Sequence, residues 1–112
     1  MNEIIHKDLA NGCWFTLTLF EQMGNIGSEV GRAAKWRARG NVVMCDSALD
    51  RALELIDLSI SDQRWRGARG REICRAREVL SDTFLGDGIY NATPEDMEKY
   101  FYHFAVVARQ GK

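Results

Sequence analysis

An arginine-rich stretch between residues 64 and 71 carries the residue types best suited to binding in this sequence. It reads Arg-Trp-Arg-Gly-Ala-Arg-Gly-Arg. The arginine fork matches phosphate and carboxylate, and the two glycines let the backbone fold around an anion. A helix that follows such a loop offers free N–H groups that favour negative charge. The stretch predicts an anion-binding or partner-binding loop that consists of Arg64, Trp65, Arg66, Arg69 and Arg71.

Two interpretations of this loop stay open. In one, RNA phosphates contact the arginines and Trp65 stacks on a base. In the other, which we favour, the arginines neutralise Asp57, Asp62 and the carbonyl end of the preceding helix, while Trp65 covers the end of the core. The chain has 15 basic and 16 acidic residues, a net charge of −1 and a pI near 6.1. Nucleic-acid binders usually show a continuous basic face, which this balance does not predict, so RNA or another polyanion is the alternative ligand.

A row of carboxylates marks the segment from 42 to 60, where Asp46, Asp50, Glu54 and Asp57 share one edge of a helical wheel. Carboxylates at such spacing can bind magnesium. Glu54 and Asp57 resemble the Glu-x-x-Asp half of the motif of the all-α nucleotide pyrophosphatases, but the preceding helix lacks the Glu-x-x-Glu half. A carboxylate-metal nucleotide hydrolase is therefore the second alternative. We expect instead a structural ion pair, because Arg77 lies on an apolar stripe and a half-buried charge needs a partner such as Asp50 or Asp57.

Residues for other chemistry are sparse. The chain has two histidines, His6 and His103, and three cysteines, Cys13, Cys45 and Cys74, none of them in a Cys-x-x-Cys pair. These counts exclude a multi-histidine metal site and indicate reduced thiols in place of a disulfide framework. No nucleophile elbow, phosphate loop or dinucleotide fingerprint is present. We predict no catalytic residue, no metal and no cofactor, and a protein that is not an enzyme.

Four periodic segments must position these residues, and each predicts a helix: about 18–39, 42–60, 69–85 and 94–109. The first begins at a capping box formed by Thr18 and Glu21, and the last begins at Thr93-Pro94, an N-cap followed by proline at the first helical position. Short connections favour antiparallel neighbours. We therefore predict one all-α domain over 1–112, an up-down-up-down antiparallel four-helix bundle with a short leader at 1–17.

The first predicted helix carries three glycines on one face, at 24, 27 and 31. Each costs about 0.5–1 kcal/mol relative to alanine inside a helix, so a compensating contact is expected. We expect the close approach of a neighbouring helix, in preference to a groove for a ligand.

Three stretches resemble a set of small bacterial all-helical proteins of unassigned function. They are Asn25-Ile26-Gly27-Ser28-Glu29-Val30 with Arg32 to Trp36, Arg51-Ala52-Leu53-Glu54-Leu55-Ile56-Asp57-Leu58, and Arg77-Glu78-Val79-Leu80. The resemblance covers the first three helices, and it implies no activity, cofactor or catalytic residue.

Four large apolar side chains are expected on the outer faces of the helices: Trp36, Leu58, Tyr102 and Val106. Apolar groups gathered outside a core mark docking surfaces. The longest uncharged run, Leu9 to Phe20, is too short to span a bilayer, and the polar N-terminus is unlike a signal peptide. We predict a cytoplasmic binding or adaptor protein that associates with itself or with another protein and not with a membrane.

Overall fold

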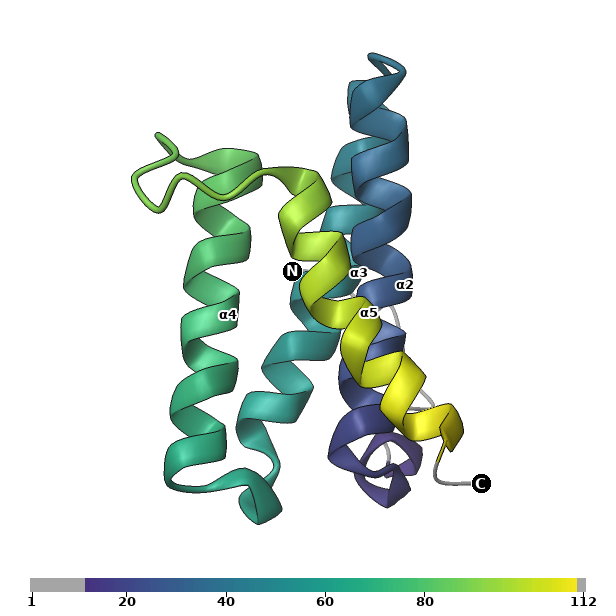
Figure 1. Ribbon diagram of the computed structural model, residues 1–112, viewed down its shortest axis with the longest axis vertical. Helices are drawn as coiled ribbons and strands as arrows, with labels where there is room; N and C mark the ends of the chain where they lie inside the picture. The colour runs from purple at the N-terminus through teal and green to yellow at the C-terminus, as the bar shows by residue number, and fades with distance from the viewer. Residues whose placement is uncertain (1–11, 111–112) are drawn as a thin grey trace.

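The computed structural model describes residues 12–110, and it is an all-α bundle of four long helices (Figure 1). These are α2 (Leu19–Ala38), α3 (Val42–Ser61), α4 (Ala68–Leu85) and α5 (Pro94–Gln110). Two short 3₁₀ turns accompany them, η1 (Cys13–Thr16) and η2 (Gln63–Trp65). The predicted fold class is confirmed, and every helix boundary lies within one residue of its predicted position. Of the predicted leader, residues 1–11 lie outside the described part of the chain.

Local hydrogen bonds explain where the helices begin. The Thr18 hydroxyl accepts from the Glu21 N–H at 3.1 Å, and the Glu21 carboxylate accepts from the Thr18 N–H at 2.9 Å. Thr93 and Asp96 form the same reciprocal pair at the start of α5, with both distances 3.0 Å. Helix α4 differs, because its N-cap is Gly67 and no side chain caps it. Its first N–H groups are therefore left for solvent or a ligand.

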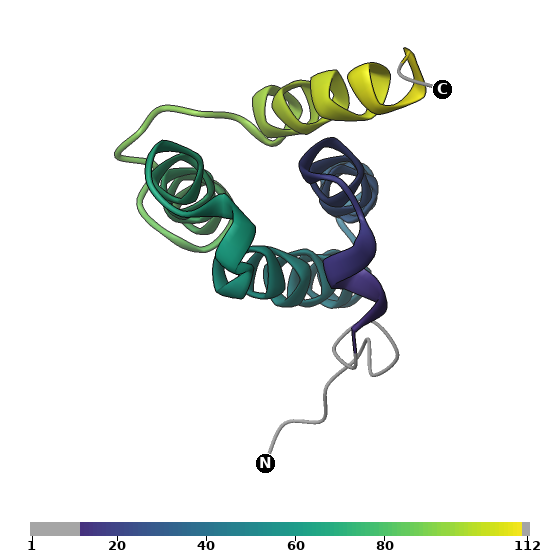
Figure 2. The ribbon, with the colours of Figure 1, turned by 90° about the horizontal axis from the view of Figure 1, so that it is seen from below.

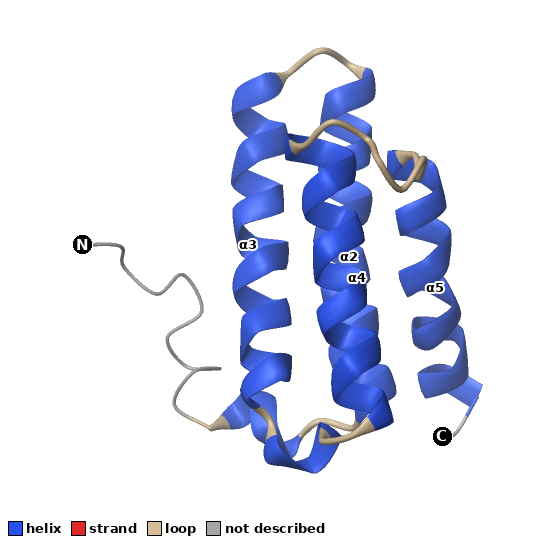
Figure 3. Cartoon of the chain, turned by 90° about the vertical axis from the view of Figure 1, so that its left-hand side faces the viewer, coloured by secondary structure: helices blue, strands red, loops and turns tan. Residues whose placement is uncertain are grey.

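Helix α2 lies between α3 and α5 and packs against both (Figures 1 and 2). Helix α4 packs mainly on α3, and its contact with α5 is slight. The antiparallel course brings the start of α4 and the end of α5 to one end of the bundle, and the α4–α5 loop lies at the other (Figure 3).

The glycines of α2 let α5 approach its backbone. A Cβ at position 27 would lie 2.6 Å from the Cβ of Phe101, and one at position 24 would lie 3.1 Å from the Cα of Ala105. The first distance is shorter than any real contact between carbon atoms, so an alanine at Gly27 would push α5 away. The expected close approach of a neighbouring helix is confirmed.

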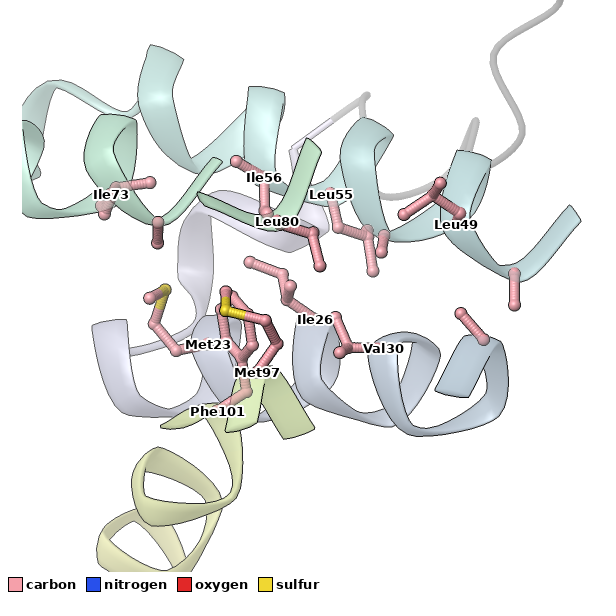
Figure 4. Packing of buried hydrophobic residues seen from close by; sticks show 14 of the residues in the cluster. Met23, Ile26, Val30, Leu49, Leu55, Ile56, Ile73, Leu80, Met97 and Phe101 are labelled. Carbon is pink, nitrogen blue, oxygen red and sulfur yellow. The ribbon is translucent and has the colours of Figure 1, made fainter. Parts of the chain in front are cut away.

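All four helices contribute to one apolar core (Figure 4). It includes Met23, Ile26 and Val30 from α2, Leu49, Leu55 and Ile56 from α3, Ile73 and Leu80 from α4, and Met97 and Phe101 from α5. Trp14 of η1 is also buried in it, which closes the core at the end where α2 begins. Among the described residues, no helix is both long enough and apolar enough to form a membrane span.

Of the four apolar side chains expected on the outer faces, Tyr102 is 58% exposed and Val106 is half-buried. Trp36 and Leu58 instead pack against the core and are only partly exposed, which corrects the expectation for these two residues. The reason is that α2 and α3 each lie between two other helices, so more of their circumference is covered than a single apolar face suggests. On α5 the neighbouring Val107 also faces outward.

Candidate binding site

The arginine-rich stretch folds into η2 and the first turn of α4, and its first arginine is used internally. Arg64 forms a two-point ion pair with Asp62, with Nε–Oδ1 at 3.0 Å and Nη2–Oδ2 at 2.7 Å. Its Nη2 also donates to the carbonyl of Leu17 at 2.7 Å. Asp62 is only 5% exposed, and the hydrogen bond from Arg64 lowers its pKa despite that burial. Arg64 therefore joins the loop to the segment before α2 and is not available to a ligand.

Beneath the loop lies a buried polar network centred on Gln22. Its Nε2 donates to the Trp14 carbonyl at 2.9 Å and to Asp62 Oδ2 at 3.0 Å, and its Oε1 accepts from Ser59 Oγ and Trp65 Nε1, both at 2.8 Å. Trp14 Nε1 in turn donates to Ser59 Oγ at 3.1 Å. No buried side-chain nitrogen or oxygen of the described residues is left without a hydrogen-bond partner. The network joins η1, α2, α3 and η2 at one end of the bundle.

The Trp65 side chain is part of this network. Its indole N–H is bonded to Gln22, and the Arg64 guanidinium lies 4.4 Å from its ring centroid. A ring held in this way covers the end of the core, as the favoured interpretation of the loop predicts. One of its faces is already occupied, which leaves it poorly placed for a nucleic-acid base.

The other predicted arginines behave differently. Arg66, Arg69 and Arg71 are exposed, and their side chains form no hydrogen bond or ion pair with any described residue. Two of them, Arg66 and Arg71, line a cavity of about 680 Å³, together with Arg75, Ile60 and Trp65. Arg69 does not line it. The structure therefore brings together part of the predicted loop, and it adds Arg75, which the sequence analysis did not single out.

The glycines of the stretch shape this cavity. Gly67 has a φ of +78°, a conformation in which side chains are strained, and it allows the chain to turn into α4. A Cβ at Gly70 would collide with the carbonyl oxygen of Trp65. The uncapped start of α4 faces this region, and the partial positive charge of a helix N-terminus adds to that of the arginines.

The predicted ion pair on the neighbouring helices is present in part. Arg77 Nε lies 2.6 Å from Asp57 Oδ1, and this hydrogen bond raises the pKa of the arginine. Asp50 is exposed and takes no part, so its inclusion was wrong. Seven residues of helix separate Asp50 from Asp57, about 10 Å, which is beyond the reach of the same arginine. Within residues 12–110, no three or more His, Cys, Asp or Glu side chains group so as to hold a metal ion.

The cysteines are all free in the described part of the chain. Cys45 is buried, and burial raises its pKa, so its thiol is unreactive. Cys13 and Cys74 are exposed, and Cys74 lies on the wall of the cavity. His103 is exposed on α5, and His6 lies outside the described residues.

Sequence analysis named Asp62 and Trp65 but missed Gln22, Ser59 and Trp14 of the buried network. A signal was nevertheless present, because Gln22 occurs three residues after Leu19 and four before Ile26, on the apolar stripe of its helix. Ser59 likewise follows Leu55 and Ile56 on the stripe of α3. A polar side chain on an apolar stripe needs a buried hydrogen-bond partner, and the Ser59 hydroxyl donates to Gln22.

No protein-family model, curated protein or solved structure matches this chain, so the chemistry of the site has to be argued from its own residues.

Proposed function

We propose that this chain is a small cytoplasmic binding or adaptor protein, not an enzyme, and that the cavity at the start of α4 holds an acidic group of a protein partner. One observation carries this proposal. Arg64 and Trp65 are fixed by the buried network, while the Arg66 and Arg71 side chains beside the cavity are paired with none of the described residues. The free thiols of the described cysteines fit the cytoplasm, where disulfides are rare.

The character of the cavity favours a protein ligand over RNA. Ile60 is 38% exposed there, and with Trp65 it gives the cavity an apolar wall. The indole that would have to stack on a base is bonded to Gln22 and covered by Arg64. A carboxylate beside an apolar side chain satisfies both the arginines and this wall, because arginine binds carboxylates through two parallel hydrogen bonds.

The test is a titration of the isotope-labelled protein, followed by NMR, with a short peptide rich in aspartate and isoleucine. We expect the largest shifts at residues 60–75. Arg66→Gln and Arg71→Gln should each weaken binding about tenfold, because each removes a direct charge-assisted contact.

Arg69→Gln is the matched control. It removes the same charge from the turn of α4 that carries Arg71, but its side chain does not line the cavity, so its effect should stay below about threefold. Equal losses in all three variants would reduce the interaction to general charge attraction and contradict the proposal. Tight binding of single-stranded RNA, with a log–log salt slope near −2 for three arginine contacts, would replace it with nucleic-acid binding.

A further inference from the structure

The loop between α4 and α5, residues 86–93, is held in one shape by Asp82. Its Oδ1 accepts from the N–H groups of Gly88 and Ile89 at 3.0 and 3.1 Å, and its Oδ2 accepts from the Tyr90 N–H at 3.1 Å. The Tyr90 hydroxyl donates to Glu78 at 3.1 Å. A loop ordered in advance loses little conformational entropy when it binds a partner.

This loop projects apolar side chains among acidic ones. Ile89 is 74% exposed and Leu85 is 65% exposed. Asp87 and Glu95 are exposed nearby in the chain, and their side chains form no hydrogen bond or ion pair with a described residue. Residues 78 to 98 contain six acidic residues and no lysine or arginine. The loop therefore has the chemistry proposed above for the ligand, an apolar group beside carboxylates.

The cavity, which runs from the start of α4 to Glu78, has the complementary chemistry. Ile60 and Trp65 provide an apolar wall, and the Arg66 and Arg71 side chains provide positive charge that no described residue pairs. Its volume of about 680 Å³ lies within the range of about 300–1,000 Å³ typical of ligand pockets. The end of α4 also brings a helix C-terminus, whose partial negative charge favours the uncapped N-terminus of another α4.

Within one molecule, Tyr90 of the loop lies against Arg75 and Glu78 at the far edge of the cavity. Arg66 and Arg71 line the cavity near the start of α4, whereas Asp87 and Ile89 follow the end of this helix of 18 residues, about 27 Å long (Figures 1 and 3), and the two arginine side chains form no ion pair with a described residue. From the complementarity of charge and apolar surface we infer that the ligand of the cavity is the α4–α5 loop of a second copy of this chain. This inference rests on the proposed function and names its partner. Because the contact joins two different surfaces, it is head-to-tail and builds a ring or an open chain of copies.

Two complementary variants test this arrangement. Ile89→Lys places a positive charge on the loop and leaves the cavity intact, whereas Arg66→Gln with Arg71→Gln removes the cavity's free charge and leaves the loop intact. Sedimentation velocity should show the wild-type chain above monomer mass at high micromolar concentration, with less association at high salt. Each variant alone should associate at least about tenfold more weakly, since the cavity arginines would face lysine in the first variant and the loop carboxylates would lose their arginine partners in the second.

The mixture of the two variants gives the sharpest result. The intact loop of one should bind the intact cavity of the other, so an equimolar mixture should form a 1:1 dimer and nothing larger. Arg69→Gln should associate like the wild type within about threefold, and circular dichroism should show the same helix content in every variant because all the substituted side chains are exposed.

A wild-type chain that is monomeric at high micromolar concentration would overturn the inference, and so would a mixture that stays monomeric while the wild type associates. If the monomeric chain still binds the acidic peptide at Arg66 and Arg71, the proposed function is supported and only the second copy as the partner is contradicted. If the chain binds RNA there instead, or binds neither ligand, both the proposed function and this inference are contradicted.

Discussion

The two ends of α4 are fixed in different ways. At its start, the connection from α3 is bonded to side chains from other parts of the chain, with Gln22 of α2 at the centre and Ser59 and Trp14 beside it. At its end, the connection to α5 is bonded to two carboxylates of α4 itself, Asp82 and Glu78. The first set of bonds is buried, and the second is largely exposed to water.

The difference shows which parts of the proposed interface depend on folding. A buried network strengthens its own hydrogen bonds, but the loss of one member leaves several others unsatisfied in a medium without water. An exposed carboxylate can be replaced by water at little cost. The cavity should therefore be as stable as the core, whereas the α4–α5 loop should be free to change without loss of the fold. Each prediction below tests this contrast.

Gln22→Leu should have the largest effect. The substitution keeps the volume but leaves two donors, the Trp65 indole N–H and the Ser59 hydroxyl, without an acceptor, and it removes one of the hydrogen bonds to Asp62, which keeps Arg64 as a partner. At about 1–3 kcal/mol for each unsatisfied group, and with some relaxation, we expect a loss of about 3–4 kcal/mol in the free energy of unfolding, measured with urea. Gln63→Leu on the exposed surface of η2 is the control, with an expected change below about 0.5 kcal/mol. A similar small change for Gln22→Leu would contradict a structural role for the network.

Asp62→Asn should come next, with an effect that depends on pH. The hydrogen bond from Arg64 lowers the pKa of Asp62 in the folded chain below its unfolded value of about 3.9. A carboxyl of this kind contributes stability above the unfolded pKa, and the contribution is lost as the pH falls through the folded pKa. At pH 7 the variant should therefore be about 1–3 kcal/mol less stable than the wild type, and the gap should narrow below about pH 4.

The control for this pH dependence is Asp57→Asn, which removes the partner of Arg77 from an exposed ion pair. Such pairs contribute about 0–1 kcal/mol, so the change should be small at every pH. If the difference in the free energy of unfolding between wild type and Asp62→Asn stays constant from pH 7 to pH 3, the charge of Asp62 does not stabilise the fold.

The helices were predictable because their signals are local. Thr18 with Glu21 and Thr93 with Asp96 form hydrogen bonds only three residues apart, and the sequence carries both partners of each box together. The close approach of α5 to Gly27 was predictable for a similar reason, since a glycine inside a helix needs an explanation.

The sorting of the arginines was not predictable, because it depends on partners distant in the sequence. Arg64 is held by Asp62, whose other partner, Gln22, is 40 residues away. The pattern of the sequence does not distinguish Arg64 from Arg66. Only the packing of α2 against α3 gives the Arg64 side chain its bonds within the fold and leaves the Arg66 side chain without a partner among the described residues. The burial of Trp36 was missed for the same reason, since it depends on which helices lie next to α2.

Gly70→Ala should have a moderate effect at the start of α4. The new methyl group would collide with the Trp65 carbonyl oxygen. The backbone of Trp65 cannot move away while its indole is bonded to Gln22. Overpacking of this kind costs about 1–3 kcal/mol, and the better helix propensity of alanine returns up to about 1 kcal/mol. We expect a net loss of about 1–2 kcal/mol. Gly31→Ala is the control, because its methyl group would meet only the movable end of Glu98, so it should be neutral or stabilising.

Asp82→Ala should have the smallest effect and the most local one. The loop amides lose their acceptor, but they are close to water, so the loss should resemble that of a helix cap, about 1 kcal/mol or less. Hydrogen exchange followed by NMR should show faster exchange of the Gly88, Ile89 and Tyr90 amides, while the indole N–H of Trp65 keeps its protection. Faster exchange at Trp65 as well would mean that the two ends of α4 are coupled, and the contrast between a buried network at one end and a self-contained loop at the other would fail.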